Sequence, residues 1–245
     1  MTEILYALDE AGVATITLNR PEARNALNVA MAEALAAAAH RATREDARLV
    51  LVRASGAVFC AGADLKERKG MTEDQVRARR LKGFAAYHAL ERLPMPSVAV
   101  VHGTAVGSGC EISAACDFVV ATQAASFRTP EALWGTVGAT QRLPRILGKR
   151  LAKDMMFTGR VLSAAEAHAA GFVTRLVEPS ALEATLAEIA RIIAGAPDAA
   201  MRLAKRCIDE GLEQGPRGAL ATELMAIEEN LALGEWRRTM VADRA

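Results

Sequence analysis

Short, almost entirely apolar segments alternate with helical segments through the first 180 residues, and this alternation restricts the fold more than any other feature. Three of these segments have the largely apolar character of buried strands: ARLVLVRA (47–54), SVAVVHG (97–103) and CDFVVAT (116–122). Between them lie an alanine-rich helical pattern at 28–45 and a charged amphipathic pattern at 73–92. Parallel strands need crossover connections of this kind, so the alternation predicts an α/β core with parallel pairing.

The two ends of the chain have different patterns. ILYAL (4–8) and VATITLN (13–19) alternate in part around turn signals, which predicts an opening β-hairpin. From residue 181 onward every pattern is helical, and Pro197 and Pro216 stand where new helices begin. We therefore expect an α/β core at 1–180 and a helical region at 181–245. The helical region is too small for a core of its own and must pack on the main domain or on another subunit.

Composition argues against several classes of protein. The 30 basic and 29 acidic residues nearly cancel, and two Trp and two Tyr offer few stacking platforms, so no nucleic-acid partner is expected. The one basic cluster, formed by Arg77, Arg79, Arg80 and Lys82, is interpreted as the solvated face of a helix. No apolar run is long enough to cross a bilayer and the N-terminus lacks the pattern of a signal peptide, so we expect a cytoplasmic protein with no membrane partner. The four cysteines have neither C-x-x-C nor Cys/His ligand spacing, so no metal site is expected.

Two glycine-containing loops each follow an apolar strand: FCAGADLKE (59–67) and GTAVGSGCE (103–111). Small residues let a ligand approach the backbone, and backbone N–H groups near a helix start bind anions. Two such loops could aim two N–H groups at one oxygen and stabilise a developing oxyanion. Neither loop has the spacing of a mononucleotide or dinucleotide fingerprint.

Glu111 and Glu131 are candidate catalytic carboxylates, and each has an ordinary structural alternative. Ser108 and Glu111 have the spacing of a capping box, in which the Glu side chain would occupy the N–H of Ser108. Glu131 follows Pro130, as is typical of an acidic residue in a first helical turn. If the two carboxylates instead converge on one water, one can accept a proton while the other donates one. Their spacing leaves both interpretations open.

Ser108 also resembles, in part, the serine of a nucleophile elbow. Its glycine neighbours are adjacent to it instead of two residues removed, so the motif is incomplete. His102 and His168 are candidate bases, although a lone histidine after a strand is more often structural. Nucleophilic hydrolysis is therefore the less favoured interpretation.

Several segments, taken in order, resemble the crotonase family: RNALN (24–28), FCAGADLKE, AVGSGCEISAACDFVVA (105–121), SFRTPEALWG (126–135), TQRLPRILGK (140–149) and MMFTGRVLSAAEAHAAGFVTRLV (155–177). The match covers most of residues 1–180 and is specific in combination, and the most similar functional type is enoyl-CoA hydratase. The resemblance implies a crotonase-like α/β spiral of ββα units with a C-terminal helical oligomerisation region. In that family the region builds homotrimers, often paired into hexamers, so the resemblance implies a homotrimer or hexamer here.

The resemblance also implies an acyl-CoA thioester substrate, with coenzyme A as part of the substrate and no separate cofactor. It assigns the oxyanion hole to the backbone N–H groups of Ala63 and Ser108. Glu111 would activate water for attack at Cβ, and Glu131 would deliver the proton to Cα. The residues implied to lie near the substrate and its CoA portion are Ala61, Gly62, Asp64, Leu65, Lys66 and Gly107.

The chain departs from the family pattern in two places. Ser108 stands where glycine is usual, which requires a negative φ or strain offset elsewhere. The loop GTVGATQRL (135–143) is shorter than the family's P-G-x-G-G-T type of loop and lacks its proline. Because that loop borders the water and the acyl chain in the family, we expect a cyclic or branched acyl group. The presence of both Glu111 and Glu131 favours hydration of a 2-enoyl-CoA, with double-bond isomerisation or a catalytically silent crotonase-fold binding protein as alternatives.

Overall fold

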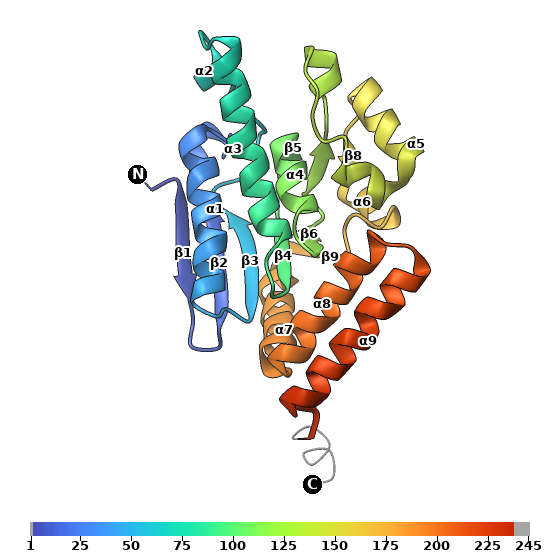
Figure 1. Ribbon diagram of the computed structural model, residues 1–245. Helices are drawn as coiled ribbons and strands as arrows, with labels where there is room; N and C mark the ends of the chain where they lie inside the picture. Colours follow the sequence, from blue (N-terminus) through green and yellow to red (C-terminus); the bar gives the residue numbers. More distant parts are fainter. Residues whose placement is uncertain (1, 238–245) are drawn as a thin grey trace.

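The computed structural model describes residues 2–237 of the 245-residue chain (Figure 1). The expected hairpin opens it, with β1 (Ile4–Leu8) antiparallel to β2 (Val13–Leu18). Four further strands extend the sheet in parallel, namely β3 (Leu49–Ala54), β4 (Ser97–Val101), β6 (Phe118–Thr122) and β9 (Arg175–Val177). The order β1-β2-β3-β4-β6-β9 confirms the parallel core predicted from the alternation.

A second, small sheet stands beside the first and was not anticipated from the sequence. It consists of β5 (Thr104–Val106), β7 (Ser126–Arg128) and β8 (Leu162–Ser163). Strands of two or three residues are too short to show a periodic pattern. A parallel bridge between Cys60 and Ala105 joins the loop after β3 to this sheet, so the two glycine-containing loops are held side by side.

Helices cover one face of the large sheet and surround the small one. The α-helices up to β9 are α1 (Val29–Arg44), α2 (Leu65–Arg68), α3 (Glu73–Glu91), α4 (Ser108–Ala114), α5 (Arg142–Thr158) and α6 (Ala164–Ala169). The 3₁₀ helices are η1 (Pro21–Ala23), η2 (Glu131–Trp134) and η3 (Pro179–Ala181). Asn28 caps α1 by accepting from the N–H of Met31, and Thr72 forms a capping box with Gln75 at the start of α3.

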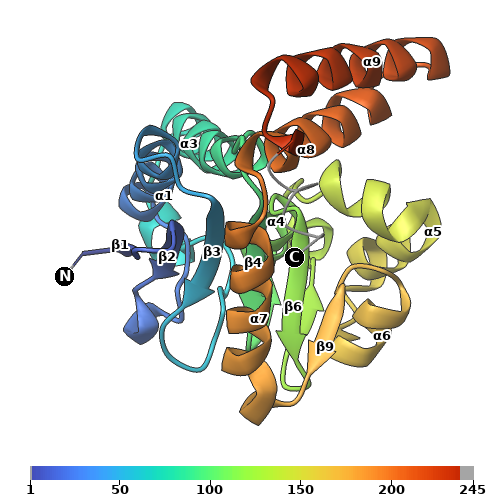
Figure 2. The ribbon, with the colours of Figure 1, turned by 90° about the horizontal axis from the view of Figure 1, so that it is seen from below.

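The opposite face of the large sheet is covered by α7 (Leu182–Gly195), the first long helix of the C-terminal region (Figure 2). Leu182, Leu186 and Ile189 of α7 pack on apolar side chains of the sheet, which are Val13, Leu49, Leu51, Val98, Val100 and Val120. Next, α8 (Asp198–Leu212) and α9 (Pro216–Leu233) form a helical hairpin that projects beyond the sheet. Residues 238–245 of the predicted helical region lie outside the described residues.

Two structural features bear on the expected classes of partner. No helix within residues 2–237 is long and apolar enough to cross a membrane. In the same part of the chain no group of three His, Cys, Asp or Glu side chains is placed to hold a metal ion. Cys60, Cys110 and Cys116 are buried free thiols, as expected for small core residues.

Candidate functional site

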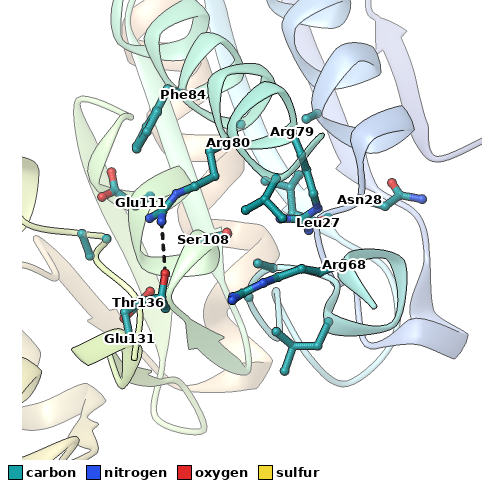
Figure 3. Close-up of a pocket in the computed structure, with 18 of the residues that line it drawn as sticks. Leu27, Asn28, Arg68, Arg79, Arg80, Phe84, Ser108, Glu111, Glu131 and Thr136 are labelled. Atoms are coloured by element: carbon teal, nitrogen blue, oxygen red, sulfur yellow. Dashed lines mark hydrogen bonds between the residues drawn. The ribbon is translucent and has the colours of Figure 1, made fainter. Parts of the chain in front are cut away.

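A cavity of about 140 Å³ lies between α3, α4 and the loops that follow β3 and η2 (Figure 3). Six of the sequence-predicted residues line it: Gly62, Ala63, Leu65, Ser108, Glu111 and Glu131. The loop at 135–143 also contributes, through Thr136, Gly138 and Ala139. The two glycine-containing loops and the two carboxylates, distant in the chain, therefore face one space.

Leu27 determines where the amide of Ala63 points. The N–H of Leu27 donates to the Gly62 carbonyl at 2.7 Å, and the Leu27 carbonyl accepts from the N–H of Asp64 at 2.9 Å. In a parallel bridge, the residue between two such partners directs its own N–H and C=O away from the neighbouring strand. The N–H of Ala63 therefore points away from Leu27, and it has no hydrogen-bond partner within the described residues.

Ser108 is the first residue of α4, and Gly107 precedes it as the N-cap with φ 51° and ψ −103°. The first N–H groups of a helix have no partner within the helix, and that of Ser108 has none elsewhere in residues 2–237. The carboxylate of Glu111 does not return to it, so the capping-box interpretation is wrong. Ser108 is also not among the residues with positive φ, which explains how serine is tolerated here.

Arg142 holds the carboxylate of Glu111 in place. Glu111 is buried, with 7% of its side chain exposed, and its Oε2 accepts from Nη1 of Arg142 at 2.9 Å. The same guanidinium donates from Nε and Nη2 to Glu91 at 3.1 and 2.6 Å. Burial lowers the pKa of Arg142, but the hydrogen bonds to Glu91 and Glu111 outweigh it and leave the pKa raised. Arg142 therefore stays protonated beside Glu111.

Glu131, at the start of η2, forms no ion pair with a cation of residues 2–237. Its Oε2 is buried without a hydrogen-bond partner in the described chain. Burial raises the pKa of Glu131 and the charge of Glu111 raises it further, while the backbone of Glu131 and the charge of Arg80 oppose this. The cavity is thus bordered by Glu111, held by an arginine, and by Glu131, whose pKa is raised by burial. Two carboxylates in such different environments are the arrangement of an acid–base pair.

Gly107 makes room for Glu131. A Cβ built on Gly107 would overlap Oε1 of Glu131, and its φ of 51° is one that L side chains rarely adopt. Both requirements exclude a side chain at this position. Gly107 therefore supports the site without lining the cavity.

Three other predicted binding residues also lie outside the cavity lining. The side chain of Asp64 accepts from the N–H groups of Lys66 and Glu67, which caps α2, and it pairs with Arg20 at 3.1 Å. Ala61 donates its N–H to the carbonyl of Arg24, and Lys66 is exposed on α2. A role for these residues toward the CoA portion of a substrate stays a prediction.

No histidine lies beside Ser108. Nε2 of His102 is 2.7 Å from the carbonyl oxygen of Gly56, and Nδ1 of His168 is 2.8 Å from that of Val173. Neither histidine lines the cavity. A serine nucleophile at position 108 would therefore lack its base.

The basic cluster of α3 was interpreted as a solvated face, and this is correct for only half of it. Arg77 and Lys82 are exposed, but Arg79 and Arg80 line the cavity. Arg79 bonds Glu67 and the carbonyl of Leu27, both at 2.7 Å. The pattern of α3 gave no sign of this, because charged residues occur all round the helix.

Comparisons with known proteins agree along nearly the whole chain. The family model described as enoyl-CoA hydratase/isomerase matches residues 9–242. The chain is 37% identical to the short-chain-enoyl-CoA hydratase of Clostridium acetobutylicum, over 95% of this chain and 91% of that protein. It is 40% identical to the mitochondrial enoyl-CoA hydratase domain-containing protein 2 of Bos taurus, over 95% and 82%. Its fold matches the crystal structure of an enoyl-CoA hydratase from Bacillus anthracis with a TM-score of 0.95 at 36% identity, over 99% and 96% of the two chains.

Proposed function

The chain belongs to the enoyl-CoA hydratase/isomerase family, the crotonase family of the resemblance, and from this we propose that it hydrates 2-enoyl-CoA thioesters. In this reaction water adds reversibly across the 2,3 double bond. The observation that carries the proposal is an unequal pair of carboxylates that line one cavity. Glu111 is held by Arg142, whereas Glu131 has no ion pair in the described part of the chain.

In the proposed reaction the thioester oxygen accepts hydrogen bonds from the N–H groups of Ala63 and Ser108. Within residues 2–237 both amides lack hydrogen-bond partners, and both residues line the cavity, which supports this role. As water attacks Cβ, negative charge moves onto the thioester oxygen. Donors that bind this charge more tightly than the neutral ester lower the barrier.

Glu111 and Glu131 divide the proton transfers. Glu111 takes a proton from the water as the water oxygen bonds to Cβ, and protonated Glu131 gives its proton to Cα. The double bond thereby gains OH and H. The proton on Glu111 then passes to Glu131 through water, which restores both groups for the next turnover.

The held carboxylate favours hydration over isomerisation of the double bond. Moving a proton between two carbons needs one group that accepts it and returns it. A second carboxylate, held in place by Arg142, has a task only where water must also be activated.

Absorbance of the conjugated enoyl thioester tests the proposal. With crotonyl-CoA, hydration removes the absorbance band, while isomerisation would instead create the band from a 3-enoyl-CoA. A protein that only binds the ester changes neither. We expect Glu111→Gln and Glu131→Gln to abolish most turnover yet still bind butyryl-CoA, whereas Glu10→Gln, on an exposed turn, behaves as the wild type. Wild-type turnover in either cavity variant removes that residue from the mechanism.

We also propose that the α8–α9 hairpin assembles the chain into homotrimers or hexamers. Large apolar side chains of this hairpin are more than half exposed: Ile208, Leu212, Leu220, Leu224, Met225 and Leu233. Soluble monomers rarely expose contiguous apolar patches of large size. Light scattering after size exclusion should give three or six times the 26.0 kDa mass of one chain, and a monomer would contradict the proposal.

A further inference from the structure

We propose that Arg80 makes this site selective for acyl-CoA thioesters whose acyl chain carries a carboxylate beyond the double bond. The inference rests on the proposed function and names the substrate class of the same cavity. It comes from the position of Arg80 and from the partners that its guanidinium lacks.

Arg80 reaches from α3 into the cavity on the side of the two carboxylates. Nη1 donates to Oγ1 of Thr136 at 3.1 Å, so the side chain crosses from the helix to the loop after η2 (Figure 3). A Cβ built on Gly138 would lie 3.8 Å from Nη2 of Arg80 and 3.7 Å from Oε1 of Glu131. The guanidinium and the proposed acid therefore border the same space above Gly138.

The charge of Arg80 has no contact partner of opposite sign in the described chain. Arg79, on the same helix, forms an ion pair with Glu67 at 2.7 Å, but Arg80 forms none. A guanidinium has five N–H donors, and the hydroxyl of Thr136 is the side-chain oxygen that Arg80 reaches. A purely apolar acyl chain packed here would desolvate the remaining donors without replacing their water. A carboxylate would accept from them in the bidentate geometry that arginine favours.

The proposed orientation of the substrate brings the end of the acyl chain to this point. The thioester oxygen lies at the amides of Ala63 and Ser108, and Glu111 and Glu131 act on the next two carbons. The acyl chain continues beyond Cβ within the same cavity, where Arg80, anchored on Thr136, is the lining cation beside the two carboxylates. Arg68 also lines the cavity, but it is exposed and extends from α2 on the other side (Figure 3).

A pair of substrates of similar size separates this role from a general effect on Glu131. Glutaconyl-CoA carries a carboxylate two carbons beyond the double bond, and 2-hexenoyl-CoA carries alkyl carbon instead. We expect Arg80→Met to lower kcat/KM for glutaconyl-CoA roughly 10- to 100-fold, the usual worth of a hydrogen bond to a charged group, with little change for 2-hexenoyl-CoA. Arg80→Lys should restore part of the preference. Arg77→Met, one turn away on an exposed side chain paired with Asp74, should change neither rate.

The outcomes distinguish this inference from the proposed function. If both esters are hydrated and Arg80→Met slows them equally, Arg80 acts through Glu131 alone and the inference is overturned while hydration stands. If neither ester is hydrated, the proposed function fails, and calorimetry with saturated esters still tests the inference. Tighter binding of glutaryl-CoA than of hexanoyl-CoA, lost in Arg80→Met, supports it; equal affinities overturn it.

Discussion

Replacing Arg142 by Met should leave the carboxylate of Glu111 buried without a cation. The two side chains are only 16% and 7% exposed, so water cannot readily take the place of the guanidinium. Removing one partner of a buried ion pair typically costs about 3–5 kcal/mol of stability. The contact of Arg142 with Glu91 adds little, because that carboxylate is 43% exposed and exposed pairs contribute at most about 1 kcal/mol. We therefore expect a loss of about 3 kcal/mol or more.

A double-mutant cycle tests whether the stranded charge is the cause. Glu111→Gln alone leaves Arg142 paired with Glu91 and should cost about 1 kcal/mol, the worth of one hydrogen bond. In the double variant no charge is stranded, so its loss should lie well below the sum of the single losses, by about 2 kcal/mol.

Urea unfolding followed by circular dichroism gives the three stabilities. The protein concentration must be held constant, because subunit association would change the apparent stability. Glu91→Gln is the matched control and should lose less than about 1 kcal/mol. Additive losses in the double variant would refute the argument, since they would mean that Arg142 and Glu111 contribute independently.

Three further predictions concern the cavity. Burial holds the pKa of Glu131 above its ordinary value of 4.5, so the folded chain binds this proton more tightly than the unfolded chain does. The folded state therefore loses stability as the pH rises from 4.5 through the raised pKa of Glu131. Glu131→Gln should therefore raise the thermal midpoint at pH 7 and leave it unchanged below pH 4.5, and a lower midpoint at pH 7 would contradict this. Gly107→Ala should cost about 1–2 kcal/mol for its positive φ and also displace Glu131, so near-normal turnover would be unexpected. Ala63→Pro removes one main-chain donor and should lower kcat about 10²–10³-fold, whereas Ser108→Ala keeps its N–H and should retain most activity; the reverse order in a steady-state assay would exclude the proposed oxyanion hole.

The order of strands and helices in the core was predictable because it depends on local patterns. The unbroken apolar character of β3, β4 and β6 signals burial on both faces, and capping residues mark the starts of α1 and α3. The short strands β5 and β7 were missed because three residues show no period. Yet β5, which pairs with β7, also bridges to Cys60 and so holds the loop with Ser108 beside the loop with Ala63.

The sequence predicted the residues of the site better than their contacts. The family motifs point to Glu111, Glu131, Ala63 and Ser108, and all four line one cavity. The ion pair of Glu111 with Arg142 was not foreseen, since nothing in the local pattern of either segment indicates a tertiary contact between them. The sequence also could not predict which arginines of α3 point into the cavity, because that helix has no continuous apolar stripe.

Because the chain is synthesised from its N-terminus, the face of the sheet that α7 covers is made before α7 itself. The valine- and leucine-rich face that this helix covers is built from strands between residues 13 and 122, all of which leave the ribosome long before residue 195 does. During that interval the nascent chain has an uncovered apolar surface of the kind that chaperones bind and that drives aggregation. A chain ending before α7 would keep this surface permanently, so its yield as folded protein should depend on chaperone supply far more than that of the full-length chain.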